Sequence, residues 1–118
     1  MLDISEVSEY IRSQPESSRI YIGGDSHRFK KNDRWYAEYT VVVVVHKEGN
    51  KGCKIFGQSD IQPDYDAVIN KPRMRLMNEV YKVADLYMAI QKVIDSRPVE
   101  IHLDINPDKA HGLSLIHI

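Results

Sequence analysis

The sequence has a single cysteine, little net charge and no long apolar stretch, and each shortage excludes a class of protein. Because Cys53 stands alone, the chain can form neither an intrachain disulfide nor a cysteine-based zinc cluster, and a reducing compartment fits this count. The longest apolar run, residues 40–45, is far too short to cross a membrane. The acidic N-terminus lacks the apolar core of a signal peptide, so we expect a cytoplasmic protein without membrane contact.

The near-neutral charge also limits the partners of the chain. Sixteen basic and 17 acidic residues leave a net charge of −1, which excludes bulk electrostatic attraction to nucleic acid or membrane. Any contact with nucleic acid must therefore come from local patches. The length of 118 residues, with 42% hydrophobic and 28% charged residues, predicts one globular domain over residues 1–118.

The first half of the chain predicts a helix followed by strands. Apolar residues recur at helical spacing over residues 3–12, and a β-branched run over 19–25 predicts a short strand that ends at Gly-Gly-Asp. The polar stretch 26–34 is interpreted as a hairpin loop, and residues 35–46 as a long strand. The five valines 41–45 are typical of a strand that is covered on both faces.

The second half adds a third strand, a helix and a fourth strand. A turn at 48–52 precedes a strand at 53–58, which completes an antiparallel meander. Residues 59–72 are rich in loop formers. Helical spacing then holds over 72–96, and the alternation of apolar and polar residues over 99–104 predicts the fourth strand.

This order predicts an α/β fold with a mixed sheet. A right-handed crossover through the helix makes the fourth strand parallel to the first, and the most economical strand order is 3-2-1-4. Residues 109–118 complete no element and are given little weight, so the domain looks truncated at its C-terminal end. The fourth strand would then have an exposed edge, through which the chain could self-associate.

Two aspartates end the strands expected at the centre of the sheet. Asp25 follows Gly23 and Gly24, which allow close approach of a ligand or a strand, and Asp104 ends the fourth strand. Parallel neighbours bring both carboxylates to the carboxyl edge, where open α/β sheets bind ligands. Such carboxylates repel each other unless a cation or a shared proton lies between them, and a hard cation such as Mg²⁺ or Mn²⁺ meets this need.

Glu79 adds a third carboxylate from the helix. It shares an apolar stripe with Leu76, Val83, Leu86 and Ile90, and a carboxylate on a core-facing stripe is costly without a partner. Structural alternatives remain open for each residue. Asp25 can cap a turn beside Ser26, Asp104 can be a strand-end turn former, and Glu79 can reach solvent or pair with Arg75.

Basic residues cluster in the first hairpin beside aromatic ones. The cations Arg28, Lys30, Lys31 and Arg34 could contact phosphates, and the neighbouring aromatic side chains Phe29, Trp35 and Tyr36 could stack on bases. His27 could position phosphate or water. The alternative is an ordinary solvated loop, which is also our interpretation of Lys71, Arg73 and Arg75.

The segments Ile-Gly-Gly-Asp-Ser-His (22–27) and Ile-His-Leu-Asp-Ile-Asn-Pro (101–107), with the valine strand and the Glu79 helix, resemble the ribonuclease-H-like superfamily. The likeness covers residues 19–108 and is greatest to the bacterial and phage proteins called YkuK-like. It implies that Asp25, Glu79 and Asp104 hold two Mg²⁺ or Mn²⁺ ions for phosphodiester hydrolysis. A further ligand normally comes from a later helix, which this chain lacks.

The leading hypothesis is therefore a metal-dependent nuclease acting on DNA or RNA. One alternative is a non-catalytic module on the same fold that binds nucleic acid or protein. Another is a nucleotide-binding domain of the actin-like ATPase kind, which ranks last because Ser26, His27 and Arg28 follow Asp25 where that family has a glycine-containing phosphate loop.

Overall fold

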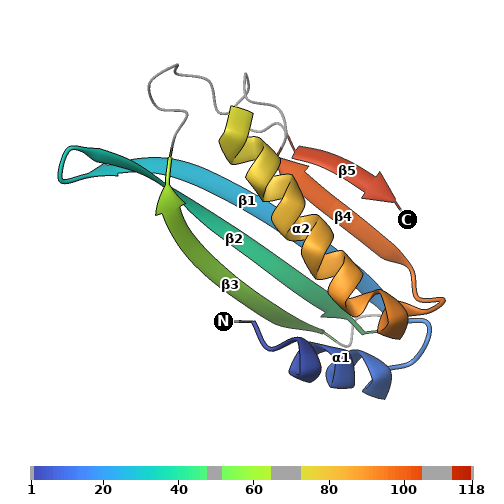
Figure 1. Cartoon of the computed structure of the whole chain (residues 1–118). Coiled ribbons are helices and arrows are strands. Elements are labelled where there is room, and N and C mark those ends of the chain that lie inside the picture. The colour runs from blue at the N-terminus through green and yellow to red at the C-terminus, as the bar shows by residue number, and fades with distance from the viewer. Residues whose placement is uncertain (1, 48–51, 65–72, 105–112, 118) are drawn as a thin grey trace.

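The computed structural model describes residues 2–47, 52–64, 73–104 and 113–117. They form one sheet of five strands in the order β3-β2-β1-β4-β5, with β1 parallel to β4 and all other neighbours antiparallel (Figure 1). The predicted α/β class and the order 3-2-1-4 are confirmed. The elements are α1 (Ile4–Ser13), β1 (Arg19–Lys31), β2 (Arg34–His46), β3 (Cys53–Pro63), α2 (Arg73–Ile94), β4 (Val99–Asp104) and β5 (Leu113–His117).

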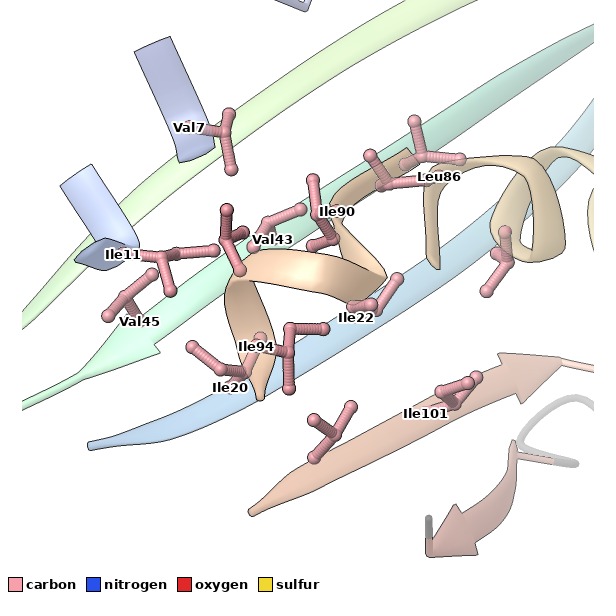
Figure 2. Close-up of a cluster of buried hydrophobic side chains, with 14 of the residues drawn as sticks. Val7, Ile11, Ile20, Ile22, Val43, Val45, Leu86, Ile90, Ile94 and Ile101 are labelled. Carbon is pink, nitrogen blue, oxygen red and sulfur yellow. The ribbon is translucent and has the colours of Figure 1, made fainter. Parts of the chain in front are cut away.

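Both helices pack on the same face of the sheet, and the core lies between them and the strands (Figure 2). Where the helices cover the sheet, alternate residues of β1, β2 and β4 face this core, as strand geometry requires. Burial of these apolar side chains removes their surface from water and is the main stabilising contribution to the fold. Fully buried members are Val7, Ile11, Ile20, Ile22, Val43 and Val45.

The valine run of β2 is covered on one face only. Val41, Val43 and Val45 are buried beneath the helices, whereas Val42 and Val44 alternate to the opposite face and stay partly exposed. Within the described ranges no helix packs on that face, which we call the open face. The prediction of a strand covered on both sides is therefore wrong for this part of the chain.

The predicted loop at 26–34 is also wrong, because β1 continues to Lys31 and pairs with β2 up to Arg34. Only Asn32 and Asp33 form the turn, and their φ angles of 52° and 62° lie in the left-handed region that tight hairpins need. Similarly, residues 59–63 extend β3 instead of forming a loop. The rest of that predicted loop (65–72) and most of the predicted turn at 48–52 lie outside the described residues.

The C-terminal segment corrects a further expectation. Residues 113–117 form β5, which pairs antiparallel with β4 from Glu100 to Asp104. This pairing satisfies backbone groups on the outer edge of β4, so that edge is not available for self-association. The tail therefore extends the sheet by one strand.

Helix α2 runs diagonally across the sheet for 22 residues (Figure 1). Its inner side carries Val83, Leu86 and Ile90, and its C-terminal end is tied to α1 because Arg97 donates hydrogen bonds to the carbonyls of Val93 and Gln14. Among the described residues, no helix is both long and apolar enough to cross a membrane.

Candidate functional site

Glu79 lies between α2 and the sheet, as its position on the apolar stripe predicts. Its side chain is 1% exposed, and the Ser26 hydroxyl donates a 2.7 Å hydrogen bond to Glu79 Oε1. Arg75, one helical turn earlier, donates from Nη1 to Ser26 Oγ at 2.7 Å and to the Ser26 carbonyl at 2.9 Å. The buried carboxylate therefore belongs to a polar network that joins α2 to β1.

Gly24 lets the helix approach the strand at this point. A Cβ atom on Gly24 would lie 2.3 Å from Val83 Cγ2 and 3.5 Å from Glu79 Cγ, and the first separation is far inside van der Waals contact. The sequence indicated a close approach to a ligand or a strand here. In the structure the close neighbour of Gly24 is α2 itself.

Asp25 lies on the other face of β1. It is exposed, and it lines a shallow depression of about 200 Å³ on the open face together with Gly23, Thr40 and His102. One of its carboxylate oxygens accepts a 2.9 Å hydrogen bond from the Ser26 backbone N–H. The sequence analysis left open that Asp25 caps a turn beside Ser26. The hydrogen bond with Ser26 agrees with that alternative, but Asp25 lies within a strand and not in a turn.

Asp104 ends β4 at the same level of the sheet. The last parallel pair is Gly24 with Leu103, so the next residues along the two strands are Asp25 and Asp104. The backbone register thus agrees with the prediction that these residues end up side by side. The Asp104 side chain lies outside the described residues.

The edge of β1 just beyond Gly24 is the candidate place for a metal ion near Asp25 and Glu79. The Asp25 side chain lies on the open face of β1, Glu79 reaches the opposite face from α2, and beyond Gly24 the edge of β1 no longer pairs with β4. The donors there are carboxylate oxygens, which suit Mg²⁺ or Mn²⁺. Within the described ranges, however, no three acidic, histidine or cysteine side chains are grouped closely enough to hold a metal ion.

Two residues of this site, Ser26 and Arg75, have a part that the sequence analysis did not give them. Ser26 was interpreted as the start of a loop, and Arg75 as a solvated cation or a direct partner of Glu79. Strand periodicity puts Ser26 on the same face as Ile22 and Gly24 only once the strand is known to continue past residue 25, and the local sequence does not show this. Arg75 lies four residues before Glu79, on the same side of the helix.

The predicted nucleic-acid-binding residues all lie on the β1–β2 hairpin. Arg28 forms a salt bridge with the nearly buried Asp64, and its guanidinium also lies 5.9 Å from the Trp35 ring. Lys30 lies 5.8 Å from the same ring. His27 pairs with Glu38 at 3.5 Å. Among the described residues, no ion-pair partner is found for three exposed cations of the hairpin, Lys30, Lys31 and Arg34.

A second cleft, of about 390 Å³, lies between α2 and the β2–β3 pair. Lys82 crosses it to reach Asp60, 3.0 Å away, and its ammonium lies 5.2 Å from the Tyr39 ring. The hydrogen bond from Lys82, followed by one from Gln62, holds the pKa of Asp60 below its ordinary value. The cleft therefore carries a compensated ion pair and lies apart from the three predicted ligands.

A parallel β1–β4 pair, an antiparallel meander and a crossing helix define a mixed α/β fold. A comparison with family models matches residues 3–117 to the family described as Ribonuclease H-like, and the chain therefore belongs to this family. Family membership supports a nuclease-like protein that binds nucleic acid. Neither the curated proteins nor the solved structures contain a match to the chain.

Proposed function

We propose that the protein is a divalent-metal-dependent nuclease that hydrolyses phosphodiester bonds in DNA or RNA, and that it is most similar to the YkuK-like members of its family. The observation that carries the proposal is the backbone register of β1 and β4 in a Ribonuclease H-like chain. Asp25 and Asp104 are the residues that directly follow the last parallel pair of these strands, at the carboxyl end of β4. Asp25, Glu79 and Asp104 are the proposed ligands of Mg²⁺ or Mn²⁺, and the family resemblance favours two ions.

Each residue has a distinct part in this proposal. Asp25 offers an exposed carboxylate to solvent and substrate, whereas Glu79 is held from the other side by the Ser26 hydroxyl. The Arg75 guanidinium lies against Ser26 and adds positive charge where a phosphate would arrive. When bound, the metal would supply an activated water and stabilise the leaving oxygen. His27, Lys30, Lys31 and Arg34 are proposed to hold the substrate's phosphates.

One observation favours a second candidate, a nucleic-acid-binding module that does not cleave. Glu79 and Asp25 lie on opposite sides of β1, and the Arg75 guanidinium, itself a cation, already donates to Ser26 at the edge of that strand. In such a module the buried network would stabilise the fold without binding metal. Substrate would then bind and remain intact.

A cleavage assay separates the two candidates. The substrates are end-labelled DNA and RNA, each as a single strand and as a duplex. We expect cleavage in the presence of Mn²⁺ or Mg²⁺. Cleavage should stop when EDTA removes the metal, because oxygen ligands bind these cations reversibly. Gel electrophoresis of the products provides the measurement. Oligonucleotide that is bound but uncut with every metal tested would contradict the nuclease and support the binding module.

A further inference from the structure

Two aromatic rings stack on the open face near the tip of the β1–β2 hairpin. Phe29 and Tyr36 are direct cross-strand partners, with ring centroids 5.7 Å apart and planes inclined by 25°. The His27 ring lies 6.0 Å from Phe29 and continues the row towards Asp25. Because the hairpin projects beyond α2 and beyond the end of β4 (Figure 1), no described helix covers these rings.

The same tip concentrates positive charge in a chain whose net charge is −1. Residues 28–34 contain four cationic side chains and a single acidic one, Asp33. Arg28 is neutralised by Asp64, which leaves Lys30, Lys31 and Arg34 exposed around the turn. A local positive patch beside aromatic rings is complementary to a polyanion whose bases have open π faces.

Strand geometry connects this patch to the proposed metal ligands. Asp25 and Phe29 are four residues apart on one face of β1, a distance of about 13 Å at ~3.3 Å per residue. At the stacked rise of ~3.4 Å per nucleotide this distance spans about four nucleotides, and an unstacked, more extended single strand covers it with fewer. A base stacked on Phe29 would therefore belong to the same short stretch of chain as a phosphodiester beside Asp25.

We propose that the hairpin tip binds single-stranded nucleic acid, with bases stacking on Phe29 and Tyr36 and phosphates held by Lys31 and Arg34. This inference rests on the proposed function and names its substrate class. A duplex is a poor ligand for these rings because its bases are already stacked on each other and expose only their edges in the grooves. Trp35 lies on the other face of the hairpin, where Arg28 and Lys30 approach its ring.

The test measures binding in EDTA, so that cleavage does not interfere. In fluorescence anisotropy with a short labelled oligothymidylate, we expect the single strand to bind at least about tenfold more tightly than the same strand annealed to its complement. The double variant Phe29→Leu/Tyr36→Leu keeps apolar side chains at both positions but has no aromatic faces, and it should lose about tenfold or more in affinity. Tyr36→Phe should bind as the wild type does.

Tyr81→Leu is the matched control, because Tyr81 is 57% exposed on α2 and lies away from the hairpin; we expect unchanged affinity. Circular dichroism verifies that each variant is folded. Equal binding of duplex and single strand, or full affinity in the double leucine variant, would overturn the proposal. A third result would also overturn it: light scattering shows that the wild type is a dimer and the double variant a monomer, while the affinity for the oligonucleotide is unchanged. The rings would then join two copies of the chain.

The failure of this inference is distinguishable from that of the proposed function. Asp25→Asn should lower metal-dependent cleavage by about 100-fold or more and retain binding of oligothymidylate in EDTA, because the aromatic rings and the cations of the hairpin tip are intact and a negative charge beside the strand is removed. A wild type that binds the single strand in EDTA and cuts nothing with metal would contradict the nuclease alone. A protein that cuts duplex but ignores the single strand would contradict this inference alone.

Discussion

Asp25→Asn lowers the rate of metal-dependent cleavage by about 100-fold or more, because an amide oxygen is a much weaker ligand for Mg²⁺ or Mn²⁺ than a carboxylate. The fold is expected to survive. Asp25 is exposed, and the asparagine side-chain oxygen can still accept the hydrogen bond from the Ser26 N–H. Initial rates of cleavage at saturating Mn²⁺ provide the measurement.

Asp33→Asn is the control for the loss of one negative charge in the same hairpin. Asn is well tolerated at the positive φ of this turn, so both stability and cleavage should remain as in the wild type. Glu79→Gln makes the comparison sharper, since glutamine can still accept from Ser26 but lacks the charge. If Glu79→Gln cleaves at the wild-type rate while Asp25→Asn loses cleavage, Glu79 is not a metal ligand. If Asp25→Asn cleaves at the wild-type rate, the proposed metal site is refuted.

Gly24→Ala destabilises the protein by about 2 kcal/mol, because the added methyl group overlaps a buried valine. The new Cβ would lie 2.3 Å from Val83 Cγ2, and Val83 is itself only 2% exposed. The β-branched valine has little freedom to rotate within a helix, so α2 must move away from β1. Urea denaturation monitored by circular dichroism measures the change in the free energy of unfolding.

Gly23→Ala is the matched substitution one residue earlier. Its Cβ would approach Val42 Cγ2 at 3.3 Å on the open face, where the neighbour can give way, and we expect a change of less than about 1 kcal/mol. In a Val83→Ala background, Gly24→Ala should cost less than in the wild type because the overlapping methyl is gone. A Gly24→Ala protein as stable as the wild type would contradict the close packing of α2 on β1.

The sequence predicts the elements whose residues face the core and misses those that depend on a partner strand. Helical spacing locates α1 and α2, and the alternation over 99–104 locates β4. The hairpin arm was taken for a loop because both of its faces are polar or solvated, so no apolar alternation reveals residues 26–31 as a strand. Its stability comes from cross-strand pairs such as Phe29 with Tyr36, which local patterns do not reveal. The tail 113–117 likewise forms a strand only by pairing with β4.

The candidate site was predicted in part. The helical wheel gives the burial of Glu79, and topology gives the adjacency of Asp25 and Asp104 along the backbone. The sequence does not predict that Asp25 and Glu79 lie on opposite faces of β1, because it indicates that a strand ends at Asp25, and a side chain at a strand end can point to either face. With β1 continuous through Ser26, the two-residue period fixes Asp25 on the open face.

The most direct test of the metal site is a calorimetric titration of Mn²⁺ into the wild type and into Asp25→Asn. The account predicts saturable binding to the wild type that is lost in the variant, with circular dichroism verifying that both proteins are folded. Binding that is unchanged in Asp25→Asn would place the metal elsewhere. A folded wild type that binds no Mn²⁺ would contradict the metal site and leave a Ribonuclease H-like chain that binds nucleic acid without cutting it.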